Sequence, residues 1–227
     1  MTKILDSVGS HAHHTSSAAH GHGDNDELFV HEFRDDEGSK VGMWIFIFTE
    51  VLLFGGLFFV YFYYRNMYGH DFHNAALHLD IAAGTNNTLI LLTSSLTMVL
   101  GLAALQKGKK IPAVLWTFLT VGFGAGFLYN KYFEWAHKVH DGIFPGSETL
   151  SMFPKGEIEF YGLYYLMTGL HTLHVIIGMI LLAVCAFKMM YNSINRDKYV
   201  VLENSGLYWH LVDLIWIFLF PLFYLLH

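Results

Sequence analysis

The chain has 227 residues, of which 54% are hydrophobic and only 14% are charged, a balance that excludes an ordinary soluble domain of this length. Its formal net charge of −6 is spread over the tail and the connections, so it gives no indication of a nucleic-acid partner. The single cysteine, Cys185, excludes a disulfide within the chain and a cysteine-based metal site. The composition therefore predicts an integral membrane protein.

The first forty residues are polar and predict a tail, 1–40, outside the membrane. A group of histidines lies there among Gly, Ser and Ala: His11, His13, His14, His20 and His22. Clustered imidazoles beside acidic residues could bind a metal ion, but the tail has no fixed ligand spacing. We favour a flexible polar extension and keep a metal-binding tail as the alternative. The tail also lacks the apolar core of a secretory signal, so the first span must direct insertion.

Five apolar segments are long enough to cross a bilayer, which requires about 20 residues of helix. Their predicted bounds are 41–64, 85–105, 112–132, 160–190 and 205–226, within a membrane domain at 41–227. Because hydrocarbon leaves no backbone group to water, we expect an all-α, polytopic helix bundle. Nine of the 13 lysines and arginines fall in the tail, the second–third connection and the fourth–fifth connection. This asymmetry predicts a cytoplasmic N-terminus and a periplasmic C-terminus.

Glu50 is the ionisable residue of the first span, about nine residues and hence roughly 13 Å along the helix axis. A carboxyl group at that depth must be protonated, paired or in contact with water. One interpretation is a partner or a proton pathway, and the other is a plain hydrogen bond between helices. The residues alone leave both open.

The second and third spans carry small and hydroxyl-bearing residues. The second span contains Thr and Asn at 85–88 and Thr-Ser-Ser at 93–95, and the third contains Gly122, Gly124 and Gly126. Such residues are typical of closely packed membrane helices. The third span ends near Glu134 and Trp135, where aromatic side chains are expected at the membrane interface.

The fourth and fifth spans carry histidines at regular spacing. His171 and His174 are three residues apart and share a helix face, so each needs a polar partner on another helix. The fifth span begins near Glu203, and its His210 and Asp213 also share a face. We expect these two to bond to each other or to a neighbouring helix, since an intramembrane aspartate needs a partner.

These residues allow three classes of function to be compared: a redox centre, a proton carrier and a structural subunit. A bis-histidine haem would require His171 or His174 together with His210, and a di-iron centre would require two Glu-x-x-His motifs, which the spans lack. A proton carrier could use Glu50 and Asp213, yet the spans show no internal repeat and no broken helices. A structural, lipid-binding subunit fits aromatic spans with a few buried polar anchors.

Four separated motifs resemble subunit III of the haem-copper terminal oxidases, that is, cytochrome c oxidase and its quinol-oxidising relatives. They lie in order at 42–50, 87–95, 168–175 and 203–216, across nearly all of 40–226. The third motif reads Thr168-Gly169-Leu170-His171-Thr172-Leu173-His174-Val175. The fourth contains Tyr208-Trp209-His210-Leu211-Val212-Asp213-Leu214-Ile215-Trp216.

The resemblance implies that Glu50 is the family's buried glutamate and bonds to a histidine of the third motif, with His174 preferred to His171. The expected buried polar residues are Glu50, Glu134, His171, His174, Glu203, His210 and Asp213. The tryptophans expected to contact lipid or other subunits are Trp44, Trp135, Trp209 and Trp216. The chain itself is expected to hold no catalytic centre, haem or metal.

The resemblance implies three partners: subunit I, subunit II and phospholipid. Subunit I holds haem and copper, and subunit II with or without copper fits the resemblance. The expected location is the bacterial cytoplasmic membrane, and the expected role is assembly, lipid binding and sustained proton uptake by subunit I. Either cytochrome c or quinol fits as the electron donor. The alternatives are an accessory protein of a nitric oxide reductase and, further off, a proton-coupled transporter.

Two departures from the family pattern stand out. The fuller family form has seven spans, and here the first two are absent, which puts a lipid-holding cleft beside them in question. The family also tends to have glutamine three residues before the glutamate of the third span, where this chain has Lys131 before Glu134. We therefore expect a different local contact at the outer surface.

Overall fold

The structure, a computed structural model, describes residues 36–195 and 198–226. The histidine-rich tail segment and both interpretations of it lie outside the described residues. Every regular element within the described ranges is a helix, and five are long and apolar enough to cross a membrane. The prediction of an all-α bundle with five spans is confirmed, whereas the side of each terminus stays a prediction.

The five long helices exceed the predicted spans at most ends. They are α2 (Asp36–Met67), α4 (Ile81–Gln106), α5 (Lys110–His140), α7 (Lys155–Met190) and α8 (Val200–Phe220). Hydropathy marks only the part of a helix that lies in hydrocarbon, so polar first and last turns were missed. The helix α2 thus begins at Asp36, inside the segment assigned to the tail. The helix α8 continues as the π-helix η1 (Pro221–Leu225), because Pro221 has no N–H for the regular ladder.

Two short helices in the connections were not predicted, α3 (Gly69–Leu77) and α6 (Glu148–Ser151). They are too short and too polar to give a membrane signal. The helix α3 is nonetheless part of the core, because Phe72 is 2% exposed and its ring meets that of Phe160 on α7 at 5.4 Å.

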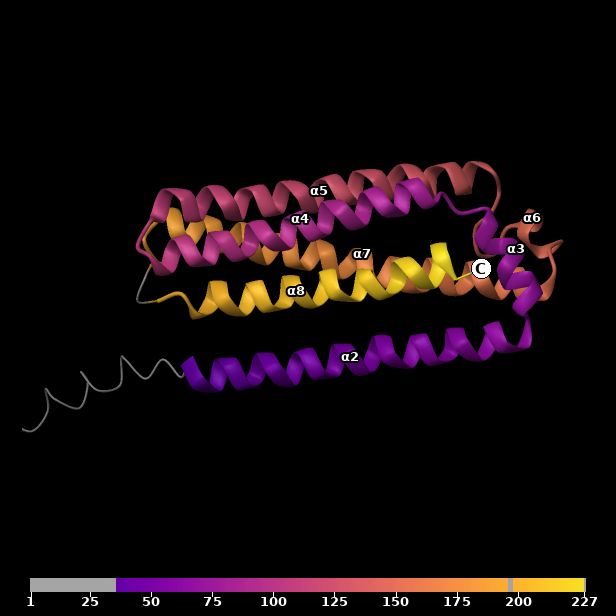
Figure 1. Cartoon of the computed structure of the whole chain (residues 1–227), viewed down its shortest axis with the longest axis horizontal. Coiled ribbons are helices and arrows are strands. Elements are labelled where there is room, and N and C mark those ends of the chain that lie inside the picture. Colours follow the sequence, from indigo (N-terminus) through magenta and orange to yellow (C-terminus); the bar gives the residue numbers. More distant parts are fainter. Residues whose placement is uncertain (1–35, 196–197, 227) are drawn as a thin grey trace, which may run out of the picture. The chain divides into compact units, whose positions relative to one another are not determined.

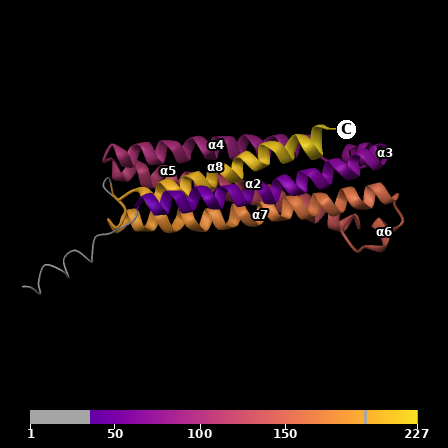
Figure 2. The same cartoon turned by 90° about the horizontal axis from the view of Figure 1, so that it is seen from below.

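Four of the long helices form a ring in which α4 contacts α5, α5 contacts α7, α7 contacts α8, and α8 contacts α4. The helix α2 lies outside this ring, against α7 and α8 (Figures 1 and 2). Most of its apolar side chains are exposed, including Trp44 at 62%. In a membrane protein such a surface faces lipid or another subunit.

The ring closes tightly where glycines meet the indole of Trp209 from α8. A Cβ at Gly124 of α5 or at Gly178 of α7 would lie 2.8 Å from that indole. By contrast, a Cβ at Gly122 or Gly126 would meet nothing within 4 Å. Of the three glycines expected to allow close packing in the third span, only Gly124 does so within this chain.

Candidate functional site

An interhelical pair joins Glu50 of α2 to His174 of α7, with 3.0 Å between Oε2 and Nε2. The two side chains are 14% and 11% exposed. The other ring nitrogen, Nδ1, lies 2.7 Å from the carbonyl oxygen of Leu170. A carbonyl only accepts, so Nδ1 carries a hydrogen. Nε2 therefore accepts a hydrogen bond from a protonated Glu50, or the imidazolium donates one to the carboxylate.

Aromatic side chains fix the position of this imidazole. The ring of Phe54 meets it edge-on at 5.5 Å, and the ring of Tyr208 stacks against it at 6.4 Å. The hydroxyl of Tyr208 donates to the carbonyl oxygen of His174 at 3.2 Å. Glu50 and His174 also line a groove of about 520 Å³ between α2, α7 and α8, whose other walls are mainly apolar.

His171, the other histidine of the motif, does not contact Glu50. Three residues turn a helix by about 300°, so the two rings diverge by about 60° and His171 points into the ring of helices. It is fully buried against Phe127 and Trp216, with ring centroids at 5.5 and 5.1 Å. Neither ring nitrogen has a hydrogen-bond partner among the described residues.

A second buried cluster surrounds Glu134 of α5. Its Oε2 lies 3.0 Å from Nζ of Lys131, and its Oε1 accepts hydrogen bonds of 2.5 Å from the hydroxyls of Tyr164 and Tyr224. Lys131 also donates to both hydroxyls, at 3.0 and 2.9 Å. All three donors of the ammonium group are thus used.

The side chain of Lys131 is 1% exposed, so its contacts lie inside the chain, and a contact that differs from the family's stays a prediction. The opposite charges at positions i and i+3 were a signal for the pair. The two tyrosines, however, come from α7 and η1, and only the tertiary fold brings them to Glu134.

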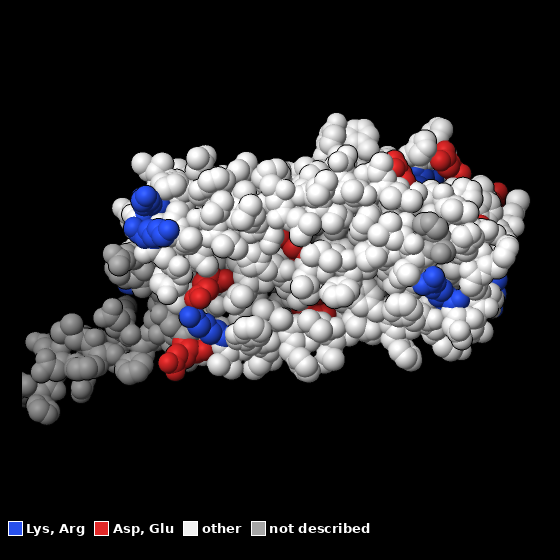
Figure 3. All heavy atoms as spheres, viewed as in Figure 1, with Lys and Arg blue, Asp and Glu red and all other residues white. Residues whose placement is uncertain are grey.

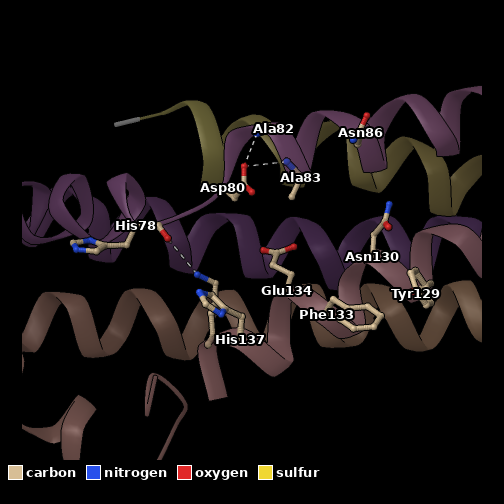
Figure 4. Close-up of a pocket in the computed structure, with 11 residues that line it drawn as sticks. His78, Asp80, Ala82, Ala83, Asn86, Tyr129, Asn130, Phe133, Glu134 and His137 are labelled. Carbon is tan, nitrogen blue, oxygen red and sulfur yellow. Dashed lines mark hydrogen bonds between the residues drawn. The ribbon is translucent and has the colours of Figure 1, made fainter. Parts of the chain in front are cut away.

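Glu134 faces a pocket of about 670 Å³ between the start of α4 and the last turns of α5 (Figure 4). Asp80 lines the same pocket and caps α4, since its Oδ1 accepts the backbone N–H groups of Ala82 and Ala83 at 2.9 and 3.1 Å. Lys138, which is 7% exposed, donates to the carbonyl oxygen of His78 at 3.4 Å.

The contact between α4 and α8 carries a row of polar bonds. Trp209 donates its indole N–H to Ser94 at 3.0 Å, and Trp216 donates to Thr88 at 3.1 Å. Both indoles are 0% exposed. The expectation that Trp209 and Trp216 contact lipid or another subunit is therefore wrong, because large aromatic rings with a single donor fill the centre of the ring of helices.

The other two tryptophans lie nearer the surface. Trp44 is exposed on α2, and Trp135 of α5 is half-buried beside Tyr165, with ring centroids 5.9 Å apart. Both positions allow the expected contact with lipid or another subunit, which stays a prediction.

His210 and Asp213 do not bond to each other. The Nδ1 atom of His210 lies 2.6 Å from the hydroxyl of Ser95 on α4, so this side chain joins a neighbouring helix. Asp213 is 3% exposed, and neither carboxyl oxygen has a hydrogen-bond partner among the described residues.

Contrary to the expectation, the side chain of Glu203 is not buried. It lies in the first turn of α8, 3.0 Å from Nζ of Lys40, and the side chains of Lys40 and Glu203 are 45% and 28% exposed. Helix α8 begins at Val200, earlier than predicted, so Glu203 sits near the end of the bundle rather than inside it. Within residues 36–195 and 198–226, no three His, Cys, Asp or Glu side chains could together hold a metal ion.

Residues 24–227 match the sequence profile of the family described as cytochrome c oxidase subunit III. The cytochrome c oxidase subunit 3 of Thermostichus vulcanus is 33% identical over 187 residues, which are 82% of this chain and 86% of the relative. The cytochrome bo(3) ubiquinol oxidase subunit 3 of Pseudomonas putida is 30% identical over 191 residues, 82% of this chain and 84% of the relative.

The quinol oxidase subunit 3 of Bacillus spizizenii is 26% identical over 205 residues, which are 90% of this chain and 95% of the relative. The stretch that matches the family profile includes the Glu50–His174 pair, the Glu134 cluster and the α4–α8 contacts. The chain belongs to the haem-copper oxidase subunit III family.

Proposed function

We propose that this chain is the haem-free subunit III of a bacterial aerobic terminal oxidase, placed in the cytoplasmic membrane beside a subunit I that holds haem and copper and a subunit II. The names of the relatives support an oxidase, and the contacts of His174 and His210 within the chain support a non-catalytic role. Both ring nitrogens of His174 have partners inside the chain, and Nδ1 of His210 bonds to Ser95. These imidazoles hold helices together.

The observation that carries the proposal is the Glu50–His174 pair at the wall of an apolar groove. The pair fixes α2, whose surface is otherwise mostly exposed, to the ring of helices. The groove is large enough to take part of an acyl chain of a phospholipid beside the pair. Anchoring of α2 and lipid contact are the means by which the subunit supports assembly and sustained proton uptake by subunit I.

The first test is purification of the chain from its own membranes in mild detergent, with a reduced-minus-oxidised optical spectrum and mass identification of the copurifying subunits and lipids. We expect haem signals that travel with a large catalytic subunit and vanish when this chain is isolated. A colourless chain that purifies alone, as a stable homo-oligomer, would contradict the proposal.

The second test addresses proton uptake. The oxidase carrying Glu50→Ala should start at a normal rate and lose activity sooner during continuous turnover than the wild-type enzyme. The adjacent Thr49→Ala is the control, because the Thr49 hydroxyl is exposed and bonds only to the carbonyl of Phe46 in its own helix. Equal turnover lifetimes in both variants would remove the pair from the proposed role.

A further inference from the structure

One stripe of α8 is left uncovered beside α4. Its residues follow one another at spacings of three and four, the pattern of a helix that packs along another helix. They are Leu207, His210, Leu214, Ile217 and Pro221. Leu214 and Ile217 are 48% and 42% exposed. Although α8 is the most buried of the five spans, this stripe is open to a neighbour outside the chain.

The adjoining surface of α4 repeats the pattern. Leu92, Leu96 and Val99 are 46%, 59% and 50% exposed, and they flank Ser95, which bonds to His210. We call these residues of α4 and the stripe of α8 together the α4–α8 face. It is turned to the viewer in Figure 3, where charged side chains gather toward the two ends and only a few acidic atoms show in the middle. That middle has the character of a surface within the membrane.

A small hollow lies in this face. It has a volume of about 140 Å³ and is bordered by Met98, Val99 and Leu102 of α4 and by Glu203, Gly206, Leu207 and His210 of α8. A Cβ at Gly206 would lie 2.9 Å from the end of Met98, so the two helices meet closely at the floor of the hollow. A hollow of this size suits one side chain of a facing helix.

His210 decides what kind of molecule covers the face. It lies about 15 Å along α8, well inside the membrane, and its side chain is only partly buried. Nδ1 is engaged with Ser95, whereas Nε2 has no hydrogen-bond partner among the described residues. In either tautomer Nε2 is then a donor or an acceptor left without a partner. An acyl chain cannot satisfy it, and such a group in hydrocarbon is unfavourable.

The exposed face of α2 gives the contrast. Its exposed polar side chain Thr49 donates to the carbonyl of Phe46 at 2.7 Å and is satisfied within its own helix. Lipid can cover this part of α2 without leaving the Thr49 hydroxyl unmet. The α4–α8 face, by contrast, presents Nε2 of His210 to its occupant, in the same helix that carries the buried carboxyl group of Asp213.

We propose that the α4–α8 face binds a transmembrane helix of another oxidase subunit, which inserts a side chain into the hollow and places a hydrogen-bonding side chain against Nε2 of His210. The partner rests on the proposed function, because it is a subunit of the haem-bearing complex. The choice of the α4–α8 face does not rest on the proposed function, because it follows from the contacts of this chain.

Photo-crosslinking in the intact complex tests the face. Benzoylphenylalanine is placed at Val99 or Leu214 on the face, or at the control positions Phe59 of α2 and Ile180 of α7, which are 74% and 59% exposed. We expect Val99 and Leu214 to give adducts with a subunit that mass spectrometry identifies as part of the haem complex, and the controls to give lipid adducts. Subunit adducts from the controls alone would overturn the proposal while the haem complex still copurifies. A chain that copurifies with no haem subunit would overturn the proposed function as well.

The hydrogen bond is tested with His210→Leu, His210→Gln and the control Thr49→Val. Loss of one hydrogen bond between membrane helices should raise the fraction of free chain in stronger detergent about three- to thirtyfold for His210→Leu. His210→Gln keeps a polar group and should lie between that variant and wild type, and Thr49→Val should match wild type. Equal retention of all variants would overturn the role of His210. If His210→Leu does not fold, His210→Gln and the crosslinks carry the test.

Discussion

The Glu50–His174 pair shows how one residue can join a helix to the bundle. The hydrogen bond that Nδ1 of His174 donates to the carbonyl oxygen of Leu170 leaves Nε2 to face Glu50, and two aromatic rings hold the imidazole in place. His171, one turn away on the same helix, is instead enclosed by aromatic rings. Two residues of the same type in one motif therefore have different roles.

Removing the carboxyl group should destabilise the chain. Glu50→Ala leaves Nε2 of His174 without a partner, and an unpaired buried polar group costs about 1–3 kcal/mol. Thermal unfolding of the purified chain in detergent should show a lower midpoint for this variant than for Thr49→Ala. The same midpoint in both variants would mean that the pair contributes nothing measurable.

Lys131 should be more sensitive than Glu50, because it is almost fully buried and bonds to three groups. Lys131→Met leaves the buried carboxyl group of Glu134 without its charged partner, and breaking a buried ion pair from one side costs about 3–5 kcal/mol. The double variant Lys131→Met/Glu134→Gln should recover part of this loss. Unfolding of the two single variants and the double variant gives the coupling, and strictly additive losses would contradict a buried pair.

Among the elements, α5 and α7 approach α8 through glycines that face one indole. Gly124→Ala would push a methyl group into Trp209, and overpacking of this kind costs about 1–3 kcal/mol. Gly122→Ala on the same helix has open space and should be neutral or slightly stabilising through helix propensity. Unfolding midpoints of the two variants provide the measurement, and a larger loss for Gly122→Ala would mean that the packing of α5 differs from the structure.

For the whole molecule, the remaining prediction is the orientation in the membrane. In a Cys185→Ala background, a cysteine in place of Lys109, between α4 and α5, should react with a membrane-impermeant maleimide only from the cytoplasmic side. One in place of Met152, which is 84% exposed between α5 and α7, should react only from the periplasmic side. The reverse pattern would overturn the orientation inferred from lysine and arginine.

The sequence by itself determined the number of spans and the polar residues that matter. Long apolar runs and the need to satisfy the backbone in hydrocarbon leave little choice but five helices. Polar side chains inside those runs are unfavourable in hydrocarbon, so the sequence alone indicates Glu50, His174, His210 and Asp213 as candidates. Helix ends were less predictable, since α2 and α8 extend past the apolar runs on which the prediction rests.

Only the tertiary structure decided which polar groups meet and which way each side chain points. A motif gives spacing along one helix, whereas a hydrogen bond between helices depends on how the helices are rotated against one another. For that reason Trp209 and Trp216 lie inside the ring of helices, Lys131 points inward to Tyr164 and Tyr224, and Gly124 packs while Gly122 does not. The uncovered stripe of α8, which includes His210, follows from the same rotation of this helix.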